Sequence, residues 1–250
     1  MASSRRRFLT ATGAGIIGLG SANLLNAQPG NETNAALNAL IATMRARVKQ
    51  IRTFYIACDL HIPGNGADWS KEDRVLTTGS TEIAFDGHML AAIHRRNGLT
   101  ITEIEKADHF RQIVDYDQQL APRRVLYDGP RGGDHRVKFS LRQFLPVPAD
   151  DVLEEGAPVL IHGRSAHRVA TQRVRLYVDD DARVQRLERL HPHTTALIET
   201  IDFDNFSFPL AGVPFPMTMS SQFPHRSPLT TAVSRIEINA TVPRQLPGVE

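Results

Sequence analysis

The sequence has almost no cysteine with which to form covalent cross-links. It contains one cysteine, Cys58, among 250 residues, so no disulfide can form within the chain. It also lacks the Cys-x-x-Cys and His-Glu-x-x-His spacings of common zinc sites, a Gly-x-Ser-x-Gly nucleophile elbow and a glycine-rich phosphate loop that ends in lysine. No local motif therefore argues for an enzyme, although catalytic groups brought together from distant positions leave no such motif.

The chain also has no net positive charge once the N-terminus is set aside. Residues 1–27 contain Arg5, Arg6 and Arg7 and no acidic residue, so their removal changes the formal net charge from +2 to −1. A chain of this charge carries no electrostatic footprint for DNA or RNA. We therefore expect no nucleic-acid partner.

The N-terminus has the order of an export signal. Arg5 and Arg6 form a twin-arginine pair, residues 11–25 are apolar and rich in glycine and alanine, and small residues end the run at Ala27. We expect residues 1–27 to be a twin-arginine signal that is cleaved near Ala27. Residues 28–250 are then expected to form a single periplasmic domain with a proline-rich C-terminal tail.

The first half of this domain predicts a helix followed by strands. Apolar residues at helical spacing indicate an amphipathic helix over residues 34–51, and aromatic and β-branched residues indicate a strand over 54–62. Asp86-Gly87 and Asn97-Gly98 are typical of tight hairpin turns between three further strands. These strands are expected at residues 75–85, 88–94 and 99–104.

The second half is expected to be mostly an antiparallel meander. Residues 106–119 predict a helix, 123–130 predict a short strand or a loop, and 164–173 predict a polar connection. Alternating or β-rich segments predict the remaining strands. These are expected at residues 137–144, 158–163, 174–178, 184–190, 196–208 and 209–219, with an edge strand at 232–238.

The arrangement resembles the LolA-like family of periplasmic outer-membrane lipoprotein carriers and sorting proteins. The resemblance rests on the exported N-terminus, the helix that leads into residues 54–62, the Phe85-Asp86-Gly87-His88-Met89-Leu90 turn and the segment from Val174-Arg-Leu-Tyr-Val178 to Ile201-Asp-Phe-Asp-Asn-Phe206. It implies an α+β fold. In this fold a strongly curved antiparallel β-sheet, an incomplete β-barrel, is covered by helices and holds acyl chains in the space between.

Apolar strand residues are the candidates to line such a space. The candidate ligand-binding residues are Phe54, Ile56, Phe85, Met89, Ile93, Phe139, Leu176, Val178 and Phe206. Phe203 is similar in type, but its odd spacing from Phe206 predicts that it faces the other side of the strand. By side-chain type alone these residues fit a close-packed core as well as a cavity.

The sequence thus favours a periplasmic binding protein or carrier for a lipid, a lipoprotein or another hydrophobic ligand, without covalent chemistry and without a cofactor. The expected partners are acyl chains and a membrane-associated protein, and the expected state is a monomer. Two alternatives remain open: a metal-binding protein or enzyme that uses His191 and His193, and a lipid-sensing regulatory domain of the same fold.

The export signal yields a direct prediction. Replacement of both Arg5 and Arg6 by lysine should leave an unprocessed precursor in the cytoplasm, because the twin-arginine pair is what the route reads. Immunoblots of cytoplasmic and periplasmic fractions measure this. Normal amounts of the processed protein in the periplasm would exclude the twin-arginine route.

Overall fold

In the part of the chain that the computed structural model describes, one large sheet is accompanied by two helices. The structure describes residues 29–61, 78–96, 98–116, 123–132, 135–137, 140–148, 153–154, 157–171, 173–191, 193–224, 226–241, 244 and 246. The elements, in chain order, are α1 (Pro29–Lys49), β1 (Phe54–His61), β2 (Thr78–Phe85), β3 (Leu90–Arg96), β4 (Leu99–Glu105), β5 (His109–Tyr116), β6 (Arg124–Pro130), α3 (Leu141–Phe144), β7 (Leu153–Glu154), β8 (Val159–Ile161), β9 (Arg164–Ala170), β10 (Val174–Asp179), β11 (Val184–Leu190), β12 (Leu197–Leu210), β13 (Val213–Phe223) and β14 (Arg226–Ile238). None of the described helices is long and apolar enough to cross a membrane.

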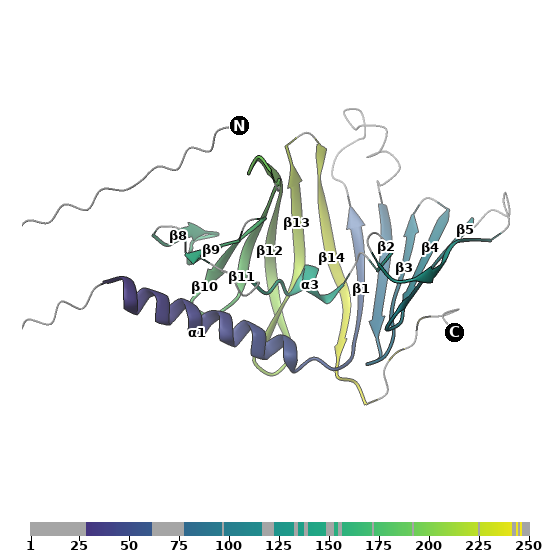
Figure 1. Cartoon of the computed structure of the whole chain (residues 1–250), viewed down its shortest axis with the longest axis horizontal. Helices are drawn as coiled ribbons and strands as arrows, with labels where there is room; N and C mark the ends of the chain where they lie inside the picture. Colours follow the sequence, from purple (N-terminus) through teal and green to yellow (C-terminus); the bar gives the residue numbers. More distant parts are fainter. Residues whose placement is uncertain are drawn as a thin grey trace, which may run out of the picture.

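The strands form a single antiparallel sheet that does not close on itself. Its order is β6-β5-β4-β3-β2-β1-β14-β13-β12-β11-β10-β9-β7, and β8 pairs with β9 beside this path. Two meanders, β1 to β6 and β9 to β14, are therefore joined where β1 pairs with β14 (Figure 1). The predicted α+β fold with a large curved antiparallel sheet is confirmed.

The C-terminal strand is longer and more central than the sequence indicated. The prediction of an edge strand at residues 232–238 was wrong, because β14 spans Arg226–Ile238 and lies between β13 and β1. Its pairing with β1 runs from Phe54 opposite Ile238 to His61 opposite Thr230. Sequence alternation shows that a segment is a strand, but it does not show which strand far away in the chain will cover its edge.

Two further sequence predictions were wrong because tertiary pairing overrides local spacing. The segment 106–119 was predicted as a helix, but β5 lies within it and pairs with both β4 and β6. The pairing of β5 with β4 is regular from Leu99 opposite Tyr116 to Glu105 opposite Phe110, so the neighbours Ile113 and Val114 alternate between the two faces, and both are buried. Burial on both faces gives apolar residues a spacing that resembles one face of a helix. The polar segment after Arg164, predicted as a connection, forms β9 and pairs with β10.

The predicted strand at residues 137–144 was wrong at its C-terminal end. Leu141–Phe144 form the short helix α3, which turns Phe144 onto the sheet. The Phe144 ring stacks on the ring of Phe215 from β13, with 5.3 Å between the ring centroids. Both side chains are fully buried.

The main core lies between the two helices and one face of the sheet, which we call the concave face. Helix α1 runs across strands β10 to β13 (Figure 1) and buries Leu37, Ile41 and Met44 at the three- and four-residue spacing of one helix face. The concave face supplies alternate residues of its strands, among them Ile56, Ile83 and Val178. The amphipathic helix was therefore read correctly.

The opposite face of the sheet carries a smaller apolar cluster beneath the C-terminal tail. Tyr55, Ala91 and Ile104 gather there around Leu246, which is 4% exposed. The guanidinium of Arg244 lies 4.5 Å from the centre of the Tyr55 ring. Arg244 and Leu246 thus pack on the face of the sheet opposite the concave face.

Both predicted hairpins are present, and the glycines of their Asp-Gly and Asn-Gly pairs have the expected positive φ. Gly87 has φ +99° and Gly98 has φ +73°, values that cost other residues energy. Asp86 Oδ1 also accepts hydrogen bonds from the backbone N–H groups of His88 and Met89, both at 2.8 Å.

The positive φ of Gly98 generates a prediction. Gly98→Val should lower the free energy of unfolding by about 1 kcal/mol or more through backbone strain alone, since nothing lies within 4 Å of the new Cβ.

Chemical denaturation measures this effect. Gly132→Val is the matched control, because Gly132 also has open space around it but not a positive φ. Equal stability of the two variants would show that the Gly98 turn carries no strain.

Candidate functional site

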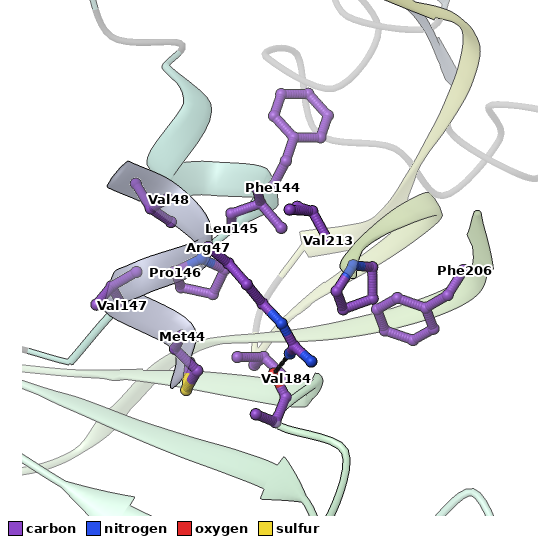
Figure 2. Close-up of a pocket in the computed structure, with 12 residues that line it drawn as sticks. Met44, Arg47, Val48, Phe144, Leu145, Pro146, Val147, Val184, Phe206 and Val213 are labelled. Carbon is purple, nitrogen blue, oxygen red and sulfur yellow. Dashed lines mark hydrogen bonds between the residues drawn. The ribbon is translucent and has the colours of Figure 1, made fainter. Parts of the chain in front are cut away.

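A small apolar cavity lies between α1, the segment that begins at α3 and the concave face. Figure 2 shows side chains from all three parts pointing into it. Its volume is about 30 Å³, which holds no more than about one water molecule. The lining residues are Met44, Arg47, Val48, Phe144, Leu145, Pro146, Val147, Ala182, Val184, Phe206, Val213 and Pro214.

One polar side chain, Arg47, enters this apolar lining. It lies one turn after Met44 on α1, so the same helix face that packs on the sheet carries the cation to the cavity. Its Nη1 donates to the backbone carbonyls of Asp181 and Ala182, each at 2.9 Å. Burial lowers the pKa of Arg47, and the carboxylates of Asp179 and Asp181 oppose this shift. Arg47 therefore joins the C-terminal half of α1 to the hairpin between β10 and β11.

The hairpin presents these carbonyls because Asp179 organises it from within. Asp179 is only 4% exposed, and its Oδ1 accepts the backbone N–H groups of Asp181 and Arg183 at 3.1 and 2.9 Å. Its Oδ2 accepts from Arg183 Nε and Gln185 Nε2 at 2.9 and 2.8 Å. Ala182 has a positive φ of 56°, which turns the backbone within the hairpin. Of the three consecutive aspartates at residues 179–181, the first is therefore a buried structural residue of the turn.

Phe206 forms another part of the wall, and its position differs from the sequence expectation. Phe203 and Phe206 were predicted to face opposite sides of β12, but both pack in the main core. Asn205, between them, has a φ of 53° and breaks the alternation of the strand. Phe203 is 1% exposed, whereas Phe206 is partly buried, and the guanidinium carbon of Arg183 lies 5.8 Å from its ring centre. Phe206 therefore borders the cavity and Phe203 fills the packed core.

The other candidate residues are divided between the two faces of the sheet. Phe54, Ile56, Phe85, Leu176 and Val178 share the main core with Phe206 but do not line the cavity. Met89 and Ile93 lie in the cluster on the opposite face, beneath the C-terminal tail. Phe139 lies outside the described residues. The binding roles of these side chains stay predictions.

Most of the cavity wall was missed at the sequence level. The stripe of Leu37, Ile41, Met44 and Val48 on α1 is visible in the sequence and indicated a buried helix face. The contributions of residues 144–147 and of Val213 and Pro214 depend on the path of the chain, and no local pattern reveals them.

The two histidines considered for metal binding lie apart from this cavity. His191 and His193 are exposed, and their ring centroids are 5.8 Å apart in an edge-on arrangement. Among the described residues, no group of three or more His, Cys, Asp or Glu side chains could hold a metal ion. Cys58 is 1% exposed, and burial raises the pKa of its thiol to about 12. A thiol of this kind is a packing group and not a nucleophile at neutral pH.

Solved structures identify the class of fold. A crystal structure of a DUF1329 family protein from Desulfovibrio piger matches 84% of this chain and 94% of its own, with a TM-score of 0.53 and 14% sequence identity. A crystal structure of a putative outer membrane lipoprotein-sorting protein domain from Vibrio parahaemolyticus matches 81% of this chain and 93% of its own, with a TM-score of 0.51 and 11% identity. The predicted LolA-like open half-barrel is therefore confirmed as the fold.

The likeness lies in the fold rather than in the sequence. No protein-family model and no curated protein sequence matches the chain. The chain covers nearly the whole length of both solved structures, so the half-barrel accounts for most of its described residues.

The contacts of Arg47 generate a prediction about α1. Arg47→Met should lower the free energy of unfolding by about 1 to 3 kcal/mol, because the carbonyls of Asp181 and Ala182 lose a charged donor. Amide hydrogen exchange should accelerate in α1 and stay unchanged in β1 and β14, since only the helix loses an attachment.

Lys49→Met is the matched control. Lys49 lies on the same helix, is exposed and makes no hydrogen bond or ion pair to another described residue. Equal exchange in the two variants would mean that Arg47 does not hold the helix.

Proposed function

We propose that this protein is an extracytoplasmic carrier that holds a hydrophobic ligand, a lipid or the acyl chains of a lipoprotein, between α1 and the concave face. The observation that carries the proposal is the apolar cavity at this boundary. Its volume is too small for an acyl chain, so the proposal requires that α1 is displaced from the concave face when the ligand binds.

The wall formed by α1 can move without disruption of the sheet. The helix contributes no strand pairing, and its attachments include the side chains of Leu37, Ile41 and Met44 and hydrogen bonds from Arg45 and Arg47. Exposure of three such apolar side chains costs about 5 to 9 kcal/mol. Burial of about a dozen methylene groups of a ligand returns about 10 kcal/mol. The two free energies are similar, which suits a carrier that must both bind and release its ligand.

Two further observations support the proposal. The Vibrio parahaemolyticus structure of the same fold is described as a putative lipoprotein-sorting domain. The N-terminus has the twin-arginine pair and the apolar run of an export signal, and the proposal takes this signal to direct the protein out of the cytoplasm. A carrier of acyl chains is needed there, because lipids cross an aqueous compartment only when their chains are shielded from water.

Substitution of Phe206 tests the position of the ligand. Phe206→Glu should abolish binding of a fluorescent fatty acid, because a bound acyl chain would strip water from the carboxylate in the wall. The thermal midpoint should change little, since Phe206 is only partly buried and Arg183 lies beside it. Fluorescence titration and thermal unfolding measure the two quantities.

Two variants of the same strand serve as controls. Phe203→Glu should unfold the protein, because it buries an unpaired charge in the packed core at a cost of several kcal/mol. Leu197→Glu, at a position that is 44% exposed, should bind and unfold like the natural protein. A stable Phe206→Glu protein that still binds the fatty acid would place the ligand elsewhere.

A further inference from the structure

The concave face becomes polar on strands β2 to β5, beyond the part that α1 covers. Thr81 Oγ1 lies 3.0 Å from Nδ1 of His94. Nε2 of His94 lies 3.7 Å from Oε2 of Glu103. The other carboxylate oxygen of Glu103, Oε1, accepts a 3.0 Å hydrogen bond from Gln112 Nε2. Thr81 is fully buried and Glu103 is 4% exposed. Each of these buried polar groups has a partner within the row.

Arg96 lies two residues beyond His94 on β3 and on the same face. Unlike the residues of this row, it has a buried polar atom without a partner. Its Nε is buried and has no hydrogen-bond partner. Among the residues that the structure describes, its guanidinium forms no ion pair. Burial lowers the pKa of Arg96, and the thiol of Cys58 provides the opposing contribution.

Two other arginines with a buried Nε show what is usual in this sheet. Arg111 lies 3.3 Å from a carboxylate oxygen of Asp128, and Arg175 lies 3.6 Å from one of Glu188. Both cations thus have an anion close by. A partly buried arginine without one costs stability, so Arg96 is a candidate to bind an anion that the described residues do not supply.

The backbone makes room for Arg96. Gly79 pairs with Arg96 across β2 and β3. A Cβ at Gly79 would lie 2.6 Å from Arg96 Cγ and 2.7 Å from the carbonyl oxygen of Arg95, so any larger residue would displace the arginine. The stem of Arg96 lies over this glycine and brings its charge within electrostatic reach of Cys58. Because Cys58 belongs to the main apolar core, the cation stands at the border of the apolar surface.

We propose that Arg96 binds the anionic group, a carboxylate or a phosphate, of the ligand whose acyl chain occupies the apolar concave face. The planar guanidinium matches both groups, with parallel N–H donors that suit two oxygen atoms. The inference rests on the proposed carrier function and adds to it the headgroup class: an anionic amphiphile rather than a neutral lipid.

Three probes of the same chain length separate the headgroup from the chain: a fatty acid, a lysophosphatidic acid and a fatty alcohol. The natural protein should bind at least one anionic probe more tightly than the alcohol. Arg96→Gln should lower the affinity for that anionic probe about tenfold or more, because a charge-assisted hydrogen bond is lost. The affinity for the fatty alcohol should stay unchanged. Whether the fatty acid or the lysophosphatidic acid responds more strongly distinguishes a carboxylate ligand from a phosphate ligand.

Arg95→Gln is the matched control, since Arg95 is the adjacent residue, faces the other side of the sheet and pairs with Glu82. It should not change the preference among the probes. Equal affinity of the natural protein for all three probes would overturn the Arg96 proposal and leave the carrier function intact. Binding of none of them would contradict both.

Thermal unfolding without ligand gives a second, independent readout. Arg96→Gln should unfold at the same temperature as the natural protein or at a higher one, because it removes an unpaired buried cation. A clear decrease in the midpoint would reveal a structural partner of Arg96 and overturn the proposal.

Discussion

The pairing of β1 with β14 is the contact on which the rest of the structure depends. It joins the N-terminal meander to the C-terminal meander across nearly the whole length of the chain. Without it the two halves would each expose a long unpaired edge, and the continuous concave face would not exist. It also positions α1, because only residues 50–53 separate the helix from β1. The helix must therefore lie across the C-terminal meander, where its apolar face becomes buried.

The concave face then has two regions with different chemistry. On one side, α1 and α3 cover an apolar surface, and Arg47 fastens the helix to a hairpin that Asp179 holds in shape. On the other side, buried polar residues of β2 to β5 form hydrogen bonds and close polar contacts with one another. Arg96 lies at the end of this row, and its charge has no partner in the described part of the chain. An apolar region bordered by an unpaired cation is complementary to an anionic amphiphile: the apolar surface suits the acyl chain, and the cation suits the anionic headgroup. The proposed carrier function and the proposed headgroup site thus describe the two ends of one ligand.

The sequence predicted the features that arise from local chemistry. The apolar stripe of α1, the alternation of β1 and the positive-φ glycines Gly87 and Gly98 each reflect a constraint within a few residues, and each was found in the structure. β5 was read as a helix because residues on both of its faces are buried, so that Phe110, Ile113 and Val114 have helix-like spacing. The position of β14 and the contribution of Phe144 to the site depend on contacts between distant segments. The αL conformation of Asn205, which brings Phe203 and Phe206 into one core, also has no clear signal in the sequence around it.

The central claim is that a hydrophobic ligand lies between α1 and the concave face, and photo-crosslinking tests it most directly. A fatty acid with a diazirine near its terminal methyl group would be bound to the purified protein, irradiated and mapped by peptide mass spectrometry. The account predicts label on the cavity wall, in the α1 segment from Met44 to Val48 and around Val213 and Pro214. Label confined to exposed apolar residues away from the cavity, such as Leu160 or Val125, would contradict it.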